Sequence, residues 1–263
     1  MLNIVVLIKQ VPGTDNVKLD PKTGVMIRSG RDTIINPLDE NALEEAIRIK
    51  NSREGVKVTA VSMGPESAVK ALKEAVAMGA DAGVLISGRA FAGSDTIATA
   101  KALAAVIKKL SPVDLVICGE RATDGETGQT GAMIANYLDF PVQTYVSAVE
   151  AKEDRVMVKR TVEGGFERVE VSYPVLLTVN KDINEPGFPT LKGKLKAKQV
   201  DISIWSSEEL DLDKSELGLQ GSPTRVVKVF SPKLSRDTIL YQADGTSKPV
   251  DELMKFLNAK EVL

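Results

Sequence analysis

Apolar runs alternate with amphipathic, helix-like stretches through the first 150 residues of the chain. The runs are nearly continuous in Val, Ile and Leu, which is typical of strands buried on both faces of a sheet, and the stretches between them repeat apolar residues at helical spacing. The runs are 4–11, 57–64, 82–88 and 113–119, and the helical stretches are 38–50, 67–80 and 95–110. This alternation predicts an α/β fold with a doubly wound, mostly parallel sheet covered by helices on both faces.

The pattern changes after residue 150. Residues 155–179 are typical of a β-hairpin turning at Glu163-Gly164-Gly165, followed by one more buried strand. Beyond residue 200 no clear core period remains, and the chain ends in the amphipathic run 249–263. We expect 185–263 to form an extended arm that lies on another molecule, because alone it offers little to bury. A loose C-terminal extension is the alternative.

Composition and charge exclude several classes of partner. The formal net charge is -2, so there is no electrostatic reason to expect nucleic acid. No apolar stretch is long enough to cross a bilayer, and the first residues are typical of a strand, not of a signal peptide. The single cysteine, Cys118, cannot form an internal disulfide, which favours a cytoplasmic location.

The chain has no histidine. Histidine-based catalytic triads and histidine metal sites are therefore excluded, and one cysteine is too few for a cysteine-ligated metal. We expect no metal site and no catalytic side chain. Any redox chemistry would come from a bound cofactor.

The turn at 119–131 is the first candidate binding loop. Gly125, Gly128 and Gly131 follow a buried strand and precede a helix, but the turn has neither the lysine-bearing P-loop motif nor a G-x-G-x-x-G motif. Free backbone N–H groups and a helix N-terminus suit a mono- or diphosphate that does not react. The alternative is an ordinary strand-to-helix turn.

Two further loops follow predicted strands. Residues 88–100 place Arg89 before a hydroxyl-rich helix start, which fits either a diphosphate or an ordinary helix cap. In residues 35–46, Asp39 could face a ribose or an adenine edge, although helix capping is the commoner role. Lys9 ends the first strand, where it either contacts a ligand or extends its amine to solvent.

Six segments in this order resemble β subunits of electron-transfer flavoproteins: VVLIKQVPG, INPLDENALEEA, VSMGP, AMGADAGVLIS, GERATDGETGQTGAMIANYLDFP and NEPGFPTLKGKLKAK. The resemblance covers essentially the whole chain. It implies a Rossmann-like nucleotide-binding domain and a heterodimer with an α subunit that carries a redox FAD. The segment FAGSDTIATA is similar to the version in bifurcating members, including those of nitrogen fixation and anaerobic acyl-CoA metabolism. Asp39 and the block 125–128 also depart from the common AMP-binding members.

The resemblance implies a cofactor site at the strand ends. In common members the site holds AMP, and in bifurcating members it holds FAD, which takes a hydride from NADH. Ser94, Asp95, Thr96 and Thr99 would meet the ribityl and diphosphate part, and Arg89 the isoalloxazine. With Lys9 from the strand-end argument, the remaining predicted contacts are Leu7, Asn36, Pro37, Leu38, Asp39, Ala60, Met63, Gly119, Glu120, Arg121, Ala122, Thr123, Asp124, Gly125, Glu126, Thr127, Gly128, Gln129 and Thr130.

The resemblance also implies partners. Residues 1–184 would form the nucleotide-binding domain, 185–200 a partner-recognition loop with Leu191 at its tip, and 201–263 an arm on the α subunit. A bifurcating member would pass electrons to ferredoxin or flavodoxin and to an acyl-CoA dehydrogenase-like or lactate dehydrogenase-like flavoprotein. A non-bifurcating subunit with structural AMP and an adenylate-binding regulatory protein are the alternatives.

Overall fold

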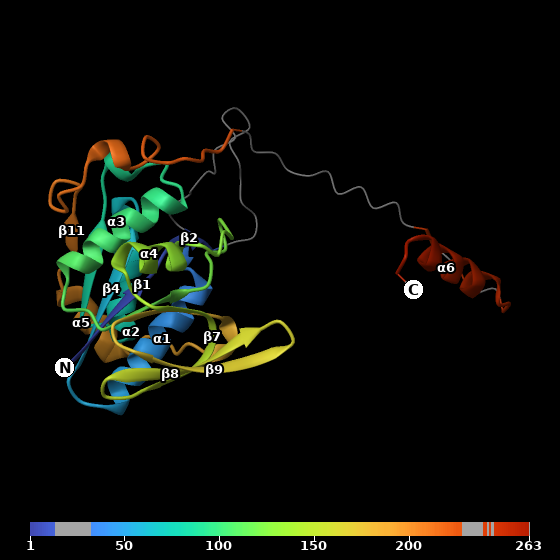
Figure 1. Ribbon diagram of the computed structural model, residues 1–263, viewed down its shortest axis with the longest axis horizontal. Helices are drawn as coiled ribbons and strands as arrows, with labels where there is room; N and C mark the ends of the chain where they lie inside the picture. The colour runs from blue at the N-terminus through green and yellow to red at the C-terminus, as the bar shows by residue number, and fades with distance from the viewer. Residues whose placement is uncertain (14–32, 228–238, 241, 243–244, 263) are drawn as a thin grey trace. The chain divides into compact units, whose positions relative to one another are not determined.

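A mostly parallel sheet organises residues 1–227 of the computed structural model, which describes residues 1–13, 33–227, 239–240, 242 and 245–262 (Figure 1). Within these residues the sheet has nine strands in the order β11-β5-β4-β1-β6-β10-β7-β8-β9. The strands are β1 (Leu2–Leu7), β4 (Val56–Met63), β5 (Ala82–Ile86), β6 (Leu115–Gly119), β7 (Val142–Ala151), β8 (Arg155–Val162), β9 (Gly165–Ser172), β10 (Val175–Val179) and β11 (Ser203–Trp205). A separate antiparallel pair joins β2 (Gln10–Pro12) to β3 (Thr33–Ile35).

Helices cover both faces of the sheet, as the alternation predicted (Figure 1). One face packs against Leu43 of α1, Leu72 of α2 and Ala197 of α5, and the other against Leu103 of α3 and Ile134 of α4. The helices are α1 (Pro37–Ser52), α2 (Val69–Met78), α3 (Thr96–Lys109), α4 (Thr130–Leu138) and α5 (Leu191–Gln199), with the single turns η1 (Glu66–Ala68), η2 (Arg89–Phe91), η3 (Lys181–Ile183) and η4 (Lys214–Glu216). The predicted doubly wound α/β fold is confirmed.

The chain order of the strands reverses between β1 and β6. These strands are parallel neighbours, with Leu7 opposite Cys118 in the register. The connection after β1 leads to α1 on one face, and the connection after β6 leads to α4 on the other. In open α/β sheets such a switch point opens a crevice at the carboxyl ends of the strands, where ligands bind.

The run expected as one strand over 4–11 is divided in the structure. β1 ends at Leu7, and Gln10 starts the short strand β2. The predicted hairpin is confirmed, since β8 and β9 pair antiparallel around Gly164 and β10 follows as a fully buried strand between β6 and β7.

We expected the chain to leave the sheet at residue 185, but the structure packs it on the sheet as far as residue 227. β11 pairs with β5, and Leu210 and Leu217 are buried against the α3 face. Residues 201–227 therefore belong to the same compact unit as the sheet, and the second unit begins at Lys228. Two isolated leucines fill gaps in the core without producing a period, so the sequence pattern did not reveal them.

The segment 185–200 also differs in part from the expected loop, because its second half is helix α5. Thr190 caps this helix by accepting a hydrogen bond from the N–H of Gly193 at 3.0 Å. A Cβ on Gly193 would lie 1.9 Å from the carbonyl oxygen of Ala77, so only glycine lets α5 approach the end of α2 this closely.

In the second unit, 228–263, the helix α6 (Lys248–Ala259) confirms the predicted amphipathic run. None of its described residues is buried. Residues 228–238, 241, 243–244 and 263 of the predicted arm lie outside the described residues. No helix in the described part of the chain is long and apolar enough to span a membrane.

Candidate functional site

The first turn of α1 joins the carboxyl ends of β1 and β6. The carboxylate of Asp39 accepts the N–H of Lys9 at 2.8 Å and the N–H of Gly119 at 2.9 Å. A Cβ on Gly119 would lie 2.6 Å from that carboxylate, so glycine is required where the strand end meets α1. The sequence left Asp39 either to face a ribose or an adenine or to cap the helix, and the structure instead turns its side chain inward, where it bridges the chain after β1 to the end of β6.

Asp39 is an unusual acid because it is buried. Burial raises its pKa to about 7, while the N–H groups of Gly119 and Lys9 and the side chain of Asn36 act in the opposite direction. Desolvation penalises the charged form of a carboxyl, and hydrogen bonds to that form favour it. The strand bridge therefore contains a group that titrates near neutral pH.

The side chain of Asn36 forms hydrogen bonds to the backbone of the glycine-rich loop. It is fully buried, its Nδ2 donates to the carbonyl of Arg121 at 2.9 Å, and its Oδ1 accepts the N–H of Thr123 at 3.1 Å. Its own N–H donates to the carbonyl of Lys9 at 2.8 Å. The residue before α1 thus fixes the start of the loop to the end of β1.

The three evenly spaced glycines have three different roles. A Cβ on Gly125 would meet nothing within 4 Å, Gly128 has a left-handed φ of 62°, and a Cβ on Gly131 would lie 2.6 Å from the Cγ2 of Thr178. Only the last glycine lets the start of α4 pack directly on the sheet. Close helix–strand packing of this kind is one use of glycine in nucleotide-binding turns.

The N-terminus of α4 is available to an anion. No side chain caps this helix, whose N-cap residue is Gln129, and the preceding residues 125–129 are exposed. Uncapped N–H groups and the positive end of the helix dipole favour a phosphate. The residues present therefore fit the phosphate of a nucleotide.

The N-terminus of α3 is different, because Asp95 caps it. The Asp95 carboxylate accepts the N–H groups of Ile97 and Ala98 at 3.0 and 3.1 Å. Although burial raises the pKa of Asp95, the N–H of Ala98 and the N–H and hydroxyl of Thr224 lower it more. The sequence left both a diphosphate and an ordinary helix cap open at this helix start, and the structure has the cap, formed by the Asp95 carboxylate.

A distant segment holds the loop that precedes α3. The N–H of Asp95 donates to the Oγ of Ser222 at 2.8 Å, the hydroxyl of Thr224 donates to the Asp95 carboxylate at 2.9 Å, and the N–H of Leu219 donates to the carbonyl of Ala92 at 3.0 Å. Sequence analysis missed these residues. The run GLQGSPT at 218–224, rich in turn residues, was the available signal.

Comparison with known proteins identifies the family. Residues 23–210 match the model of the electron transfer flavoprotein domain. The chain is 48% identical to "Electron transfer flavoprotein subunit beta" of Thermoanaerobacterium thermosaccharolyticum over the whole of both chains. It is 42% identical to "Caffeyl-CoA reductase-Etf complex subunit CarD" of Acetobacterium woodii, also over the whole of both. It is 43% identical to "Protein FixA" of Azotobacter vinelandii over 88% of this chain and 85% of that protein.

The chain belongs to the family of electron transfer flavoprotein β subunits. Electron transfer is the activity of this family, and the alternative of an adenylate-binding regulatory protein is set aside. The resemblance stated from the sequence motifs is confirmed.

The structure of this flavoprotein subunit brings most predicted contact residues to one edge. Leu7 and Met63 are the last residues of β1 and β4, and their side chains are buried and half-buried on the α3 and α4 face. Arg89 is exposed just after β5, and Thr96 and Thr99 lie in the first turn of α3. The structure does not bring Ala60 there, because it pairs with Val6 in the middle of β4 and its side chain is fully buried.

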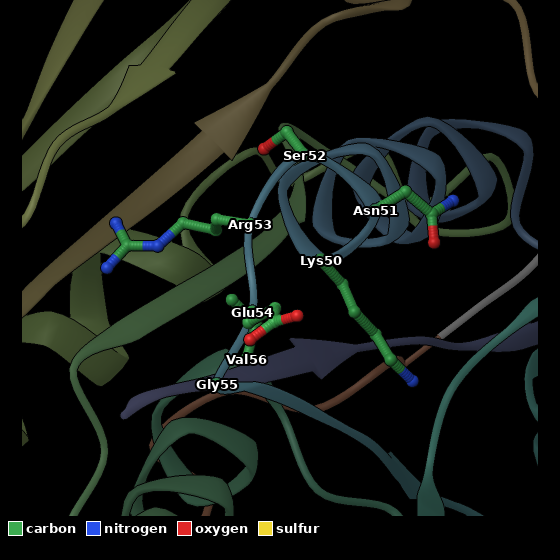
Figure 2. A pocket seen from close by; sticks show the side chains of 7 residues that line it. All are labelled: Lys50, Asn51, Ser52, Arg53, Glu54, Gly55 and Val56. Carbon is green, nitrogen blue, oxygen red and sulfur yellow. The ribbon is translucent and has the colours of Figure 1, made fainter.

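An open hollow lies at the opposite edge of the sheet, at the turn from α1 to β4 (Figure 2). Its side chains point in different directions (Figure 2), and three of them are already engaged, beginning with Ser52, which donates to the carbonyl of Ile49 at 2.8 Å. Lys50 forms an ion pair with Asp81 at 2.5 Å, and Arg53 donates to the carbonyl of Lys152 at 2.6 Å. This hollow is not a candidate site.

The predicted docking residue, Leu191, is 76% exposed at the start of α5. Phe188 and Leu195, which sequence analysis did not single out, are 96% and 54% exposed, and Lys192 and Lys194 are exposed beside them. An i, i+4 leucine pair was the signal that could have found Leu195. We refer to residues 184–195 as the docking segment.

Proposed function

We propose that this chain is the β subunit of a bifurcating electron transfer flavoprotein, with FAD at the strand edge between residues 88–95 and 119–130. The FAD would accept a hydride from NADH. One of its two electrons would go to ferredoxin or flavodoxin, and the other would pass through the α-subunit FAD to a partner dehydrogenase. The chain itself would bind and orient the cofactor and carry no catalytic side chain.

The separation of the two loops carries this proposal. One loop follows β6 and the other follows β5, with β1 and β4 between them. Three strand spacings of about 4.8 Å place the loops roughly 14 Å apart. A mononucleotide needs only one such loop, whereas a dinucleotide spans both. The segment 217–224 supports the reading, because it fixes the loop 88–95 that AMP alone would not use.

The chain's residues would divide the work along the edge. The uncapped start of α4 would hold phosphate, and Asn36 would keep the glycine-rich loop in position for it. Because the Asp95 carboxylate is already satisfied by the start of α3 and by Thr224, the hydroxyls of Thr96 and Thr99 remain as polar groups for a ribityl chain. Ser94 donates its hydroxyl to the carbonyl of Phe91 at 2.8 Å, so it would offer only its acceptor lone pairs. Arg89, exposed in the turn after β5, would meet the isoalloxazine.

The names of two relatives agree with a dehydrogenase partner. The chain is similar to a subunit of a caffeyl-CoA reductase-Etf complex, and it is 38% identical to "Acryloyl-CoA reductase electron transfer subunit gamma" of Anaerotignum propionicum. We infer an acyl-CoA dehydrogenase-like partner that docks on Leu191, with a lactate dehydrogenase-like flavoprotein as the other candidate. An apolar anchor flanked by lysines suits an acidic partner surface with an apolar pocket.

A non-bifurcating subunit with structural AMP is the second candidate. The capped start of α3 favours it, because of the two loops that a dinucleotide would span, only the glycine-rich loop leads into a helix whose N-terminus no side chain caps. That single anion site would be sufficient for AMP.

Counting the cofactors decides between the two. The chain is co-purified with its α subunit, the nucleotides are extracted, and flavin is quantified. Two FAD per heterodimer, with the flavin bleached by NADH, is the expected result. One FAD and one AMP per heterodimer would refute bifurcation and establish the second candidate.

A further inference from the structure

A cluster of buried polar side chains on α1 grips the beginning of the docking segment. Asn41 donates through Nδ2 to the carbonyl and to the side-chain oxygen of Asn184, at 2.8 and 3.0 Å. Asn184 donates through its own Nδ2 to the carbonyl of Asn41 and to the carboxylate of Glu45, each at 3.0 Å. Glu44 accepts the N–H of Gly187 at 3.1 Å.

Five hydrogen bonds join α1 to residues 184–187, and some of them involve buried polar side chains. Asn41 and Glu45 are 5% and 7% exposed, and a carboxylate is seldom buried to that extent unless it is paired. Burial raises the pKa of Glu45, and the hydrogen bond from Asn184 lowers it. Burying these polar groups costs desolvation free energy. The hydrogen bonds that the groups make in return fix the position of residues 184–187.

The same helix begins at the strand edge. Asn36 and Asp39 attach the start of α1 to the glycine-rich loop and to the ends of β1 and β6. Along α1, residues 37 and 45 are eight positions apart, about 12 Å at 1.5 Å per residue. One rigid element thus connects the nucleotide edge to the base of the docking segment.

We propose that Asn41, Glu44 and Glu45 are positioning residues that hold the docking segment in its binding-competent arrangement, so that Phe188 and Leu191 are presented to the partner dehydrogenase without further ordering. This inference rests on the proposed function of the docking segment. Pre-ordering lowers the free-energy cost of association, since each long side chain or loop residue fixed on binding costs affinity. Loosening the cluster would therefore weaken docking and leave the nucleotide edge intact.

The test uses the complete heterodimer with NADH as donor and a purified acyl-CoA dehydrogenase as acceptor. We expect Asn41→Ala and Glu45→Ala to raise the KM for the dehydrogenase 3- to 10-fold, with kcat within 2-fold and NADH reduction of the flavin unchanged. Glu45→Gln keeps an acceptor oxygen for Asn184 and should restore a nearly normal KM. Glu40→Ala is the matched control, because Glu40 lies on the same helix beside Glu74 and outside the cluster.

Coupling to Phe188 and Leu191 separates positioning from general destabilisation. In the Phe188→Ala/Leu191→Ala background, where both presented side chains are already lost, Asn41→Ala should raise the KM no further. Additive effects in that background, or an unchanged KM in both Asn41→Ala and Glu45→Ala, would overturn the proposal.

Hydrogen exchange provides a measurement that does not depend on the dehydrogenase. Glu44 lies at the surface side of the cluster, and Glu44→Ala should raise the exchange rate of the Gly187 amide about 10-fold in the heterodimer. Unchanged exchange would show that the cluster does not order the segment. If Leu191→Ala alone leaves the KM unchanged, the docking role in the proposed function fails, whereas the exchange result still reports on the cluster.

Discussion

Replacing Asn36 by alanine tests whether the glycine-rich loop is pre-organised for a nucleotide. The substitution removes two hydrogen bonds, to the carbonyl of Arg121 and from the N–H of Thr123, from a fully buried side chain. At about 1 kcal/mol each, the loss is about 2 kcal/mol of unfolding free energy. For a domain of this size that corresponds to a Tm lower by roughly 4–8 °C.

Nucleotide affinity should fall together with stability. Without Asn36 the start of the loop must be ordered when the phosphate binds, and fixing one backbone residue costs about 1–2 kcal/mol. A cost of 1.4 kcal/mol is tenfold in Kd, so we expect AMP and FAD to bind about 10-fold more weakly. Calorimetric titration of the nucleotide-depleted heterodimer with each nucleotide measures this directly.

Asn41→Ala is the matched control for this prediction. Asn41 is also a buried asparagine at the start of α1 and also loses two side-chain hydrogen bonds, but its partner is Asn184 and not the loop. We expect a similar drop in Tm and an unchanged nucleotide Kd. Equal nucleotide affinities in the two variants would refute the idea that Asn36 acts through the loop.

Four further predictions follow from individual contacts. The folded-state pKa of Asp39 is about 7, whereas an unfolded carboxyl titrates near 4, so the folded chain retains a proton between these values and stability falls as pH rises through this window. Asp39→Asn should remove up to about 4 kcal/mol of this pH dependence, and parallel curves of unfolding free energy against pH for the two proteins would contradict it. Gly131→Ala should cost about 1–3 kcal/mol by overpacking, while Gly125→Ala, whose Cβ meets open space, should leave the Tm unchanged. Thr224→Val removes the hydroxyl that donates to Asp95 and so helps to hold the loop before α3. It should weaken FAD binding severalfold but not AMP binding, as measured by titration with each nucleotide. Leu191→Ala should slow electron transfer to the dehydrogenase while NADH still reduces the flavin at the normal rate, and equal loss of both activities would argue against docking.

The buried strands and the helices between them were predictable because periodicity directly reports burial. A run such as 113–119 has one interpretation in a parallel sheet, and α3 lies within the predicted helical stretch 95–110, with Asp95 as its cap. The hairpin around Gly164 follows in the same way, since a pair of glycines ends two alternating runs. Such signals depend only on neighbouring residues, and the helices and strands form where these signals predict them.

The site was less predictable because its geometry depends on contacts distant in sequence. Asp39 looked available to a ligand from its position at a helix start, but it accepts two backbone N–H groups, one from Lys9 after β1 and one from Gly119 at the end of β6. Thr224 reaches Asp95 across 129 positions, and no pattern near either residue indicates the other. The even spacing of the glycines was misleading, because a Cβ on Gly125 would meet open space whereas a Cβ on Gly131 would collide with Thr178.

Lys9 shows what the glycine-rich loop does without a P-loop lysine. The structure brings a lysine to the loop from the end of β1, where its Nζ lies 2.6 Å from the carboxylate of Asp124. Asp124 is only 7% exposed, so this pair ties the loop to the strand and neutralises the cation. A lysine that stabilises a transferring phosphate must face that phosphate with its charge available. Here the charge is used to hold the loop, so we expect a nucleotide phosphate to be seated chiefly by backbone N–H groups. That arrangement suits a nucleotide whose phosphates take no part in the chemistry, which is a property that AMP and FAD share.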